Sequence, residues 1–375
     1  MKRALTFALF LLTAHLALAQ LATDNGQQTT PWQLGPFTRP IAAPVISPNK
    51  TSLFDDPIRH APVHWEALHT FNPAAIVRDG RIFVLYRAED DTGPMQIGLH
   101  TSRLGLASSS DGITFTRQPQ PVFYPAPDTQ QAREWPGGVE DPRIVETADH
   151  TYVITYTQWN RVTYSIGIAT SADLIHWTKF GPAFLGSKQG KYDHLQYKSG
   201  GIVTQLVGEK LIAARINGRF WMYWGEGAIH LATSPDLIHW TPVEDAAGNP
   251  VEVLTRRPGH FDSGFPEVGP PPVLTAAGIV VLYNGKNDPA NGDPALGPNA
   301  YAAGQALFSA TDPAHLIART DAPSLKPEQP FEKTGQYAAG TTFAEGLVRF
   351  HNRWFLYYGC ADSAVGVVET TPGNP

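Results

Sequence analysis

Cysteine is almost absent from this sequence, because Cys360 is the only one among its 375 residues. A single thiol excludes an intrachain disulfide and any zinc site built from several cysteines. Leu356, Tyr357 and Tyr358 precede it and are typical of a buried strand, so Cys360 is interpreted as a small apolar core residue. The alternative, a catalytic thiol, has no supporting motif around it.

Charged residues are also scarce, at 17% of the chain, and the formal net charge is −6. Nucleic acid is therefore not expected as a partner, because its binding depends on a basic face that releases counterions. Hydrophobic residues reach 42%, which is enough to fill a large core and excludes general disorder.

Long apolar runs are missing beyond the N-terminus, so no membrane insertion of the mature protein is expected. The one apolar run, residues 4–19, follows Lys2 and Arg3 and ends in Ala17-Leu18-Ala19. This pattern predicts a signal peptide over residues 1–19, cleaved after Ala19. Export without disulfides fits a bacterial protein that is periplasmic or secreted. Residues 20–51 are polar and rich in proline and are predicted to form an extended N-terminal arm.

Strong helical patterns are lacking too, whereas 34 Gly and 33 Pro are spread along the whole chain. Such a composition favours short strands joined by turns. One unit, Ser-x-Asp-(Gly/Leu)-Ile-x-(Phe/Trp)-Thr, begins at Ser109, Ser171 and Ser234, and a degenerate copy begins at Ser309. The copies follow one another at intervals of about 60 to 75 residues, which indicates a repeat architecture.

Alternating β-branched and aromatic runs lie between these copies and are typical of half-buried strands. They cover residues 79–86, 149–156, 208–214, 277–283 and 352–358. Five strand-turn-strand units predict an all-β fold, a five-bladed β-propeller that forms one catalytic domain over residues 52–375. Two β-sandwiches in tandem are the alternative, but the repeat crosses any boundary at the midpoint.

Motifs of several enzyme classes are absent, namely the phosphate-binding loop, HExxH and GxSxG. The 13 histidines show no metal-ligand spacing, and His176 and His239 occupy one repeat position, which indicates a structural role. Polar clusters instead follow the predicted strands, whose equivalent ends converge at one mouth of a propeller. The clusters are Asn72 with 86–90, 137–144 around Glu140, Asp141 and Arg143, 220–227 around Tyr223 and Glu226, 260–272 around Asp262 and Glu267, and 357–362 with Asp362.

Each cluster also has a plain structural interpretation. Arg143 could form a salt bridge at the start of a strand, and Glu226 could be a solvated carboxylate on a turn. Pro142 is expected to restrict Asp141 to extended backbone, so that its side chain points in one defined direction. Together, carboxylates, arginine and aromatics without metal ligands suit glycoside chemistry, with one carboxyl as acid and another as base or nucleophile. No metal or cofactor is expected.

In these residues the chain resembles glycoside hydrolase family 130, the five-bladed β-mannoside phosphorylases and mannosidases. The resemblance implies that Asp141 is the general acid, relaying its proton through the 3-hydroxyl of the mannose in the −1 subsite. It also implies that Arg87 and Asp362 bind the sugar. Asn72, Glu140, Arg143, Lys198, Tyr223 and Asp262 are further candidates for substrate binding. The matching segments keep their order and are 72–74, 85–89, 109–112, 140–144, 217–223, 232–240, 269–272 and 357–362.

One departure from the family pattern bears on the nucleophile. Phosphorylases of the family carry a basic element, typically His-Arg, just after the strand that matches 217–223, where it binds phosphate. Here that place reads Trp224-Gly225-Glu226, and a carboxylate there repels phosphate. Hydrolytic members carry a Glu at this place and a second before Gly-Pro-Pro-Pro, which implies that Glu226 and Glu267 orient and deprotonate water. Shared charge is expected to raise the pKa of one of them.

The sequence therefore predicts an inverting exo-β-mannosidase, acting on β-1,2-linked manno-oligosaccharides. One alternative is a phosphorylase that forms α-mannose 1-phosphate and binds phosphate through Lys198, Arg215 or Arg219. Another is a non-catalytic propeller that binds mannosides. Loops 118–134 and 284–300 are expected to set the length of the substrate, and the oligomeric state is left open.

Overall fold

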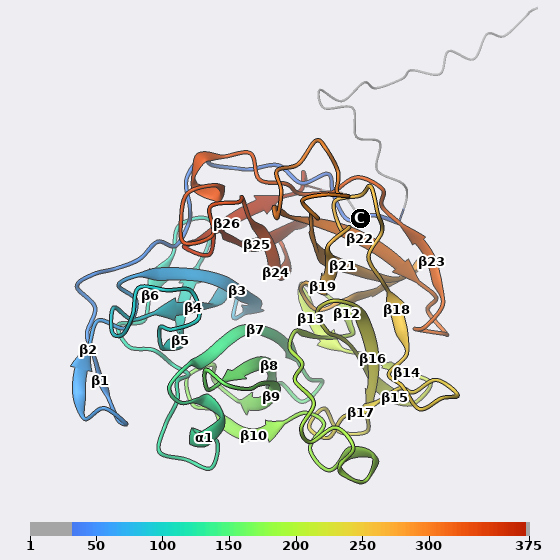
Figure 1. Cartoon of the computed structure of the whole chain (residues 1–375). Helices are drawn as coiled ribbons and strands as arrows, with labels where there is room; N and C mark the ends of the chain where they lie inside the picture. Colours follow the sequence, from blue (N-terminus) through green and yellow to red (C-terminus); the bar gives the residue numbers. More distant parts are fainter. Residues whose placement is uncertain (1–31, 373–375) are drawn as a thin grey trace, which may run out of the picture.

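The computed structural model describes residues 32–372, so the predicted signal peptide and the start of the arm lie outside the described residues (Figure 1). Within this range the helical segments are one short helix, α1 (Gln131–Glu134), and two 3-10 turns, Ser187–Gly190 and Pro330–Glu332. None of them approaches the length and hydropathy that a membrane-spanning helix needs. Strands make up the rest of the regular structure, which confirms the all-β class.

Most strands pair with their neighbours in the chain as antiparallel groups. The first group contains β3 (His69–Arg78), β4 (Arg81–Glu89), β5 (Ser102–Ser109) and β6 (Thr116–Arg117), and β1 (Phe54–Asp56) and β2 (Ala61–Val63) form a separate hairpin before it. The second contains β7 (Gly138–Glu146), β8 (Tyr152–Trp159), β9 (Tyr164–Ser171) and β10 (Thr178–Pro182).

The next group is less regular. It contains β11 (Gly200–Ile202), β14 (Arg215–Ile216), β15 (Arg219–Trp224), β16 (Ile229–Ser234), β17 (Thr241–Pro242) and β18 (Glu252–Leu254), beside the hairpin of β12 (Thr204–Val207) and β13 (Lys210–Ala213). Then follow β19 (Phe265–Val268), β20 (Val273–Thr275), β21 (Gly278–Lys286), β22 (Tyr301–Phe308) and β23 (Leu316–Arg319). The last group is β24 (Thr342–Phe350), β25 (Arg353–Cys360) and β26 (Ala364–Glu369).

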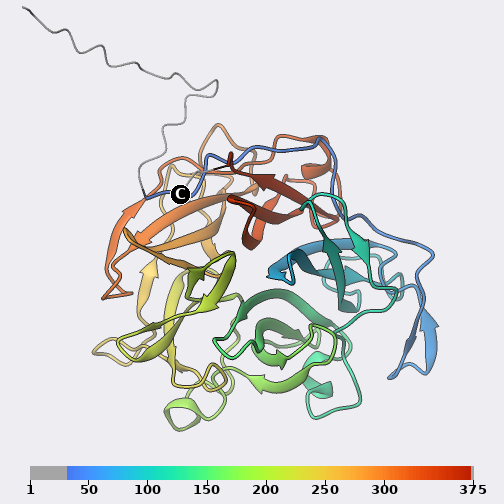
Figure 2. The ribbon, with the colours of Figure 1, turned by 180° about the vertical axis from the view of Figure 1, so that it is seen from behind.

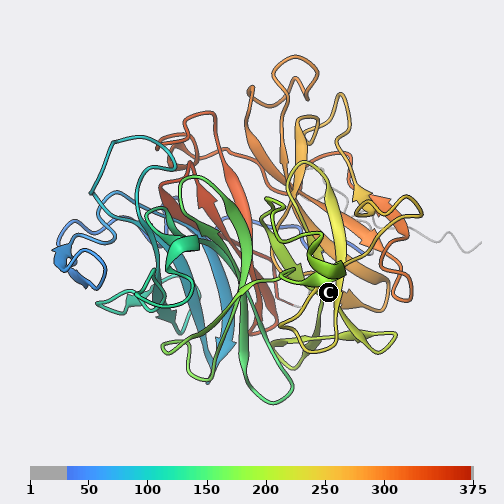
Figure 3. The ribbon, with the colours of Figure 1, turned by 60° about the horizontal axis from the view of Figure 1, so that its bottom comes forward.

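The groups are arranged around a common centre, as the front and back views show (Figures 1 and 2). Their innermost strands, among them β3, β7 and β24, face one another there, while loops extend from both ends of the molecule (Figure 3). This is the propeller-like arrangement that the repeat predicts. Cys360 is fully buried in it, as expected of a small core residue.

The repeated Ser-x-Asp unit forms the turns that follow β5, β9 and β16. The Ser109 hydroxyl accepts hydrogen bonds from the backbone N–H of Asp111 and Gly112, and an Asp111 carboxylate oxygen accepts two more. The turns at Ser171 and Ser234 repeat these contacts. His176 and His239 are exposed on these turns, where each imidazole contacts the turn Asp, so they serve the turn itself.

The described part of the N-terminal arm covers the outer edge of β26. The backbones of Thr38 and Glu369 exchange two hydrogen bonds of 2.8 Å, and Val365 pairs with Val45 and Ile46 further along. The Gln305 side chain binds the N–H and C=O of Leu34 at 2.9 and 2.8 Å. The arm thereby satisfies a strand edge that would otherwise be open to pairing with another chain.

Substitution of Ile46 tests how much this arm contributes to the free energy of unfolding. The Ile46 side chain is 1% exposed and packs in the core formed by β3, β4 and the last strands. Replacing it with Ala removes buried methyl groups and leaves a cavity. We expect Ile46→Ala to lower the free energy of unfolding by roughly 2–5 kcal/mol, measured by urea unfolding. A midpoint equal to that of the unchanged protein would show that the arm is not part of the cooperative fold.

Candidate functional site

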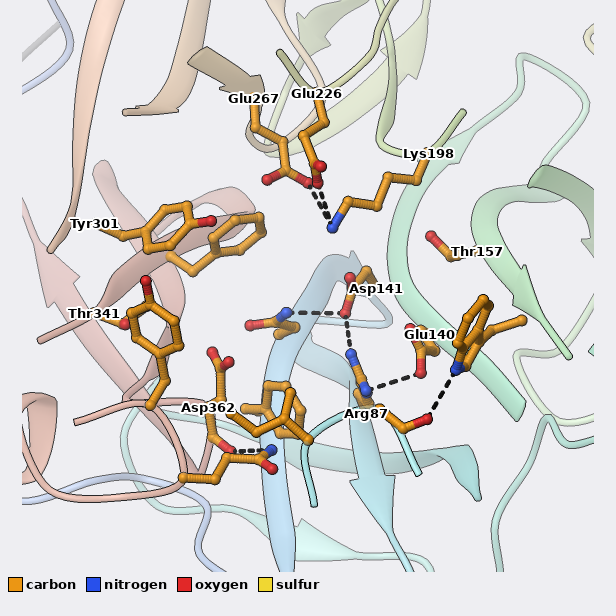
Figure 4. Close-up of a pocket in the computed structure, with 18 of the residues that line it drawn as sticks. Arg87, Glu140, Asp141, Thr157, Lys198, Glu226, Glu267, Tyr301, Thr341 and Asp362 are labelled. Carbon is orange, nitrogen blue, oxygen red and sulfur yellow. Dashed lines mark hydrogen bonds and ion pairs between the residues drawn. The ribbon is translucent and has the colours of Figure 1, made fainter. Parts of the chain in front are cut away.

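A cavity of about 380 Å³ lies where the strand groups meet, a size typical of a small-molecule site (Figure 4). Its residues come from β3, β4, β7, β8, β9, β19, β22 and β24 and from the loops between them. The convergence of strand ends, expected from the repeat, therefore brings most of the predicted polar residues together. Those that line the cavity are Asn72, Arg87, Glu140, Asp141, Lys198, Glu226, Glu267 and Asp362.

β-Bulges direct side chains into this centre from β3 and β7. The pairing of β3 with β4 skips Asn72, and the pairing of β7 with β8 skips Asp141 and Pro142. Both Asn72 and Asp141 adopt positive φ, 44° and 47°, a conformation that non-glycine residues rarely hold outside functional sites. The predicted extended backbone of Asp141 is therefore wrong, because the bulge outweighs the influence of Pro142. The Asn72 side-chain amide donates to Asp141 Oδ1 over 2.9 Å.

Arg87 is the central cation on this side of the cavity and is 8% exposed. Its guanidinium lies 3.2 Å from Asp141 Oδ1, 2.8 Å from Glu140 Oε1 and 2.6 Å from Glu89 Oε1. Its Nε donates to the Ser102 hydroxyl, which in turn donates to Glu140 Oε1. Each of the three guanidinium nitrogens of Arg87 thus contacts a group of the protein.

Glu140 and Asp141 differ in their affinity for a proton. Burial raises the pKa of Glu140 to about 7, against the opposing charge of Arg87. Burial also acts to raise the pKa of Asp141, but the charges of Arg87 and Lys198 and the hydrogen bond from Asn72 bring it below its ordinary value. Below a pH of about 7, the adjacent pair therefore holds its proton on Glu140 rather than on Asp141.

A second pair of carboxylates faces Asp141 across the cavity (Figure 4). Lys198 Nζ lies 2.6 Å from Glu226 Oε2 and 3.6 Å from Glu267 Oε1, and the Ser199 hydroxyl donates to Glu267 Oε1 over 2.6 Å. The backbones of the two Glu residues form an isolated bridge. The Glu226 side chain is 33% exposed, whereas that of Glu267 is 1% exposed.

The expected rise in the pKa of one Glu is found at Glu267, where the pKa is about 7. Burial is the largest cause, and the charge of Glu226 adds to it, while Lys198 opposes both. Burial acts to lower the pKa of Lys198, but the charges of Glu267 and Glu226 raise it well above its ordinary value. Lys198 is thus a permanent cation between the two carboxylates.

Asp362 follows β25 and lines the cavity beside Arg87 (Figure 4). Its φ of 50° places it, like Asn72 and Asp141, in the left-handed region. Burial raises its pKa to about 7, against the opposing charge of Arg87. The Gln336 side chain holds this corner by donating to the Asp362 carbonyl over 2.8 Å.

Three predicted substrate-binding residues do not line the cavity, which corrects their assignment. The Tyr223 hydroxyl donates to the Pro313 carbonyl, and its ring packs in the core. Asp262 is fully buried in an ion pair with Arg319. Arg143 is 2% exposed, and its donors are taken up inside the protein. Each lies close in sequence to a cavity residue, but its side chain points to another face.

Several cavity residues escape the sequence analysis. They are Phe71, Ile97, Gly98, Thr157, Trp159, Tyr164, Tyr301, Gln336, Tyr337, Thr341 and Phe343. Loops 118–134 and 284–300 contribute no lining residue, whereas residues 97–98 and 336–341 do. Trp159 and Tyr164 could have been found from the sequence. They are aromatic residues at the end of β8 and the start of β9, on either side of one turn.

One group of side chains near the cavity has atoms that could ligate a metal ion. His69, Glu89 and His100 offer ligand atoms that all lie within 4.8 Å of one another. Both oxygens of Glu89 already accept hydrogen bonds, one from Arg87 over 2.6 Å and one from Gln336 over 3.2 Å. The group is thus built into the polar support of the cavity.

Comparison with known proteins shows the family to which the chain is related. The family profile described as β-1,4-mannooligosaccharide phosphorylase, Glyco_hydro_130, matches residues 38–372. A 1,2-β-oligomannan phosphorylase of Thermoanaerobacter sp. (strain X514) is 31% identical over 307 residues, which are 81% of this chain and 90% of the relative.

Solved structures are closer still. One solved structure has a TM-score of 0.91 at 51% identity, and the match covers 93% of this chain and 97% of that chain. It comes from work on the GH130 family of mannoside phosphorylases, which reports that the family contains glycoside hydrolases that target β-1,2 mannosidic linkages in Candida mannan. A glycosyl hydrolase from Bacteroides ovatus has a TM-score of 0.90 at 50% identity, with coverages of 93% and 97%. By its sequence and its structure, the chain belongs to glycoside hydrolase family 130.

Proposed function

We propose that this protein is an inverting exo-β-mannosidase that cleaves β-1,2-linked manno-oligosaccharides with water as the nucleophile. The observation that carries the proposal is the charge of the cavity. Among its described lining residues, Arg87 and Lys198 are the only Lys or Arg. The carboxylates outnumber them and are those of Glu140, Asp141, Glu226, Glu267 and Asp362. Both cations are already paired, so a phosphate dianion would meet carboxylates without a free basic partner.

The two carboxylate pairs supply an acid and a base on opposite sides of the cavity (Figure 4). Glu267, with a pKa of about 7, suits a base that takes a proton from water near neutral pH. Lys198 and Glu226 would hold that water in place. The Glu140–Asp141 pair supplies the proton for the leaving group, with Asp141 as the residue that delivers it through the sugar 3-hydroxyl. Inversion requires acid and base carboxyls about 6.5–9.5 Å apart, with room for the water between them.

A phosphorylase is the second candidate, and its support is that the Thermoanaerobacter relative is a phosphorylase. Of the phosphate ligands considered from the sequence, Lys198 lines the cavity, whereas Arg215 and Arg219 do not. Arg215 donates instead to the carbonyls of Gly218 and Pro235 on the surface. Phosphate would therefore have to share Lys198 with Glu226 and Glu267.

The experiment that separates the candidates is incubation with β-1,2-mannobiose, with and without inorganic phosphate, followed by proton NMR. Release of α-mannose at the same rate in both samples supports the hydrolase. Formation of α-mannose 1-phosphate only with phosphate would contradict it. Affinity for the disaccharide without any product would support the non-catalytic binding propeller.

Trp159 is expected to contribute a stacking surface for the sugar, because it lines the cavity and its indole N–H is held by the Gly98 carbonyl over 3.0 Å. We expect Trp159→Ala to raise KM about tenfold, or about 1.4 kcal/mol of binding, with a smaller change in kcat. Trp159→Phe keeps a ring and serves as the control. Steady-state kinetics that show an unchanged KM for Trp159→Ala would remove Trp159 from the sugar-binding surface.

Two further parts of the proposal concern architecture and location. We propose that each antiparallel group of strands is one blade of a five-bladed propeller, which the antiparallel pairing of strands that lie near one another in the chain supports. We also propose that the protein is exported to the bacterial periplasm or beyond, which the pattern of residues 1–19 supports. N-terminal sequencing of the mature protein tests the export, because it should begin at Gln20.

A further inference from the structure

We propose that Arg143 is a positioning residue that fixes the distance between Asp141 and Glu267, the acid and the base on opposite walls of the cavity. The inference deepens the proposed function and rests on it. It assigns a role in the reaction to a side chain that does not itself reach the substrate.

The guanidinium of Arg143 bridges the two walls through backbone carbonyls. Its Nη1 donates to the carbonyl of Asp141 over 2.9 Å. Asp141 lies on the bulge of β7 that directs its side chain into the cavity. Its Nη2 donates to the carbonyl of Val268 over 2.8 Å, and its Nε to that of Gly269 over 3.1 Å. These two carbonyls directly follow Glu267 in the chain. One planar group therefore holds the backbone of the acid and the backbone of the base at once.

A buried carboxylate completes this arrangement from a third group of strands. Glu345 Oε1 lies 2.7 Å from Arg143 Nη1, and Glu345 is 0% exposed. It occupies the point where the pairing of β24 with β25 skips a residue, as Asn72 and Asp141 do in their strands. The Asn284 side chain fixes that point by exchanging two hydrogen bonds with the backbone of Ala344.

The chemistry of these contacts requires an arginine. The guanidinium is a rigid plane whose donors point in fixed directions, so it can hold three carbonyls and one carboxylate together. A lysine keeps the charge but concentrates its donors on one flexible nitrogen, so it cannot span both walls. Since a misplacement of about 1 Å at a reacting centre can cost about 100-fold in rate, loss of this bridge is expected to act on catalysis.

The test is Arg143→Lys, compared with Arg103→Lys as a matched control. Arg103 is also fully buried and is paired with two carboxylates, Asp56 and Asp90, as Arg143 is paired with Glu345, but it contacts neither acid nor base. Both variants are expected to lower the melting temperature. For Arg143→Lys, per folded molecule, we expect kcat to fall about 100-fold with KM within about threefold. Arg103→Lys should keep both constants.

Two further measurements make the result decisive. Arg143→Ala removes the charge as well, and because Arg143 helps to lower the pKa of Glu267, the acid limb of its pH–rate curve should move to higher pH. A merely structural role would leave the curve in place. Crystal structures of wild type and Arg143→Lys should show Asp141 and Glu267 displaced relative to each other in the variant.

The outcomes separate this inference from the proposed function. All rates are measured with and without phosphate. If the wild type turned over substrate only with phosphate, the proposed hydrolase function would be wrong. The comparison of the Arg143 variants with wild type would remain valid. An unchanged kcat in folded Arg143→Lys would overturn the positioning role. If wild type turned over no mannoside, the crystal structures would still decide, because unmoved Asp141 and Glu267 in Arg143→Lys overturn the inference.

Discussion

Asp141→Asn is expected to lower kcat for β-1,2-mannobiose by about 10²–10⁴-fold, the range that general acid catalysis contributes. The substitution removes the carboxyl group that passes the proton to the leaving group but keeps an oxygen that can accept the hydrogen bond from Asn72. The fold and KM should therefore change little. Steady-state kinetics, with circular dichroism to confirm folding, provide the measurement.

Glu140→Gln is the matched control, because its pKa of about 7 makes Glu140 the member of the pair that holds the proton. If Asp141 delivers the proton and Glu140 only stores it, Glu140→Gln should cost roughly 10- to 100-fold, less than Asp141→Asn. The reverse order would assign the acid to Glu140. Activity of Asp141→Asn close to wild type would exclude Asp141 from catalysis altogether.

The fold could be predicted from the sequence because its signals are local and repeated. The Ser-x-Asp turn is formed by hydrogen bonds within about five residues, so each copy can be recognised without knowledge of its neighbours. The alternating runs then locate the strands on either side of it. Convergence of the strand ends follows from the repeat, and it places Arg87, Asp141, Glu267 and Asp362 in one cavity.

The side of a strand from which each side chain projects was harder to predict than the fold. Tyr223, Asp262 and Arg143 lie within a few residues of Glu226, Glu267 and Asp141, yet none of the three reaches the cavity. In a strand a shift of one residue reverses the face, and a bulge adds such a shift without a clear mark in the sequence. Asp141 shows the difficulty, since Pro142 after it predicts extended backbone and the observed φ is 47°.

The loop residues of the cavity could not be predicted for a different reason. Ile97, Gln336 and Thr341 lie outside the alternating runs, so no periodic pattern marks them. Gln336 holds its place through the carbonyl of Asp362 and the carboxylate of Glu89, contacts that span 26 and 247 residues of sequence. The contact with Glu89 exists only once the first and last groups of strands have come together.

Glu267→Gln is expected to lower kcat by about 10²–10⁴-fold at every pH, because the base that deprotonates water is lost. In wild type, Glu267 must be ionised and the Glu140–Asp141 pair must hold its proton, and the pKa values of Glu267 and Glu140 are both about 7. The profile of kcat/KM against pH should therefore be bell-shaped with a maximum near pH 7, and Glu267 should set its acid limb. The measurement is kcat/KM against pH for wild type, Glu267→Gln and Glu226→Gln.

Glu226→Gln distinguishes the two carboxylates. The charge of Glu226 raises the pKa of Glu267, and Lys198, now paired with Glu226 over 2.6 Å, lowers it. Removing the Glu226 charge takes away the first effect and frees Lys198 to strengthen the second, so both changes lower the pKa of Glu267. The acid limb of kcat/KM should therefore move to lower pH in Glu226→Gln, with part of the activity kept. If instead Glu226→Gln were inactive at every pH and Glu267→Gln retained activity, the base would be Glu226, the more exposed member of the pair.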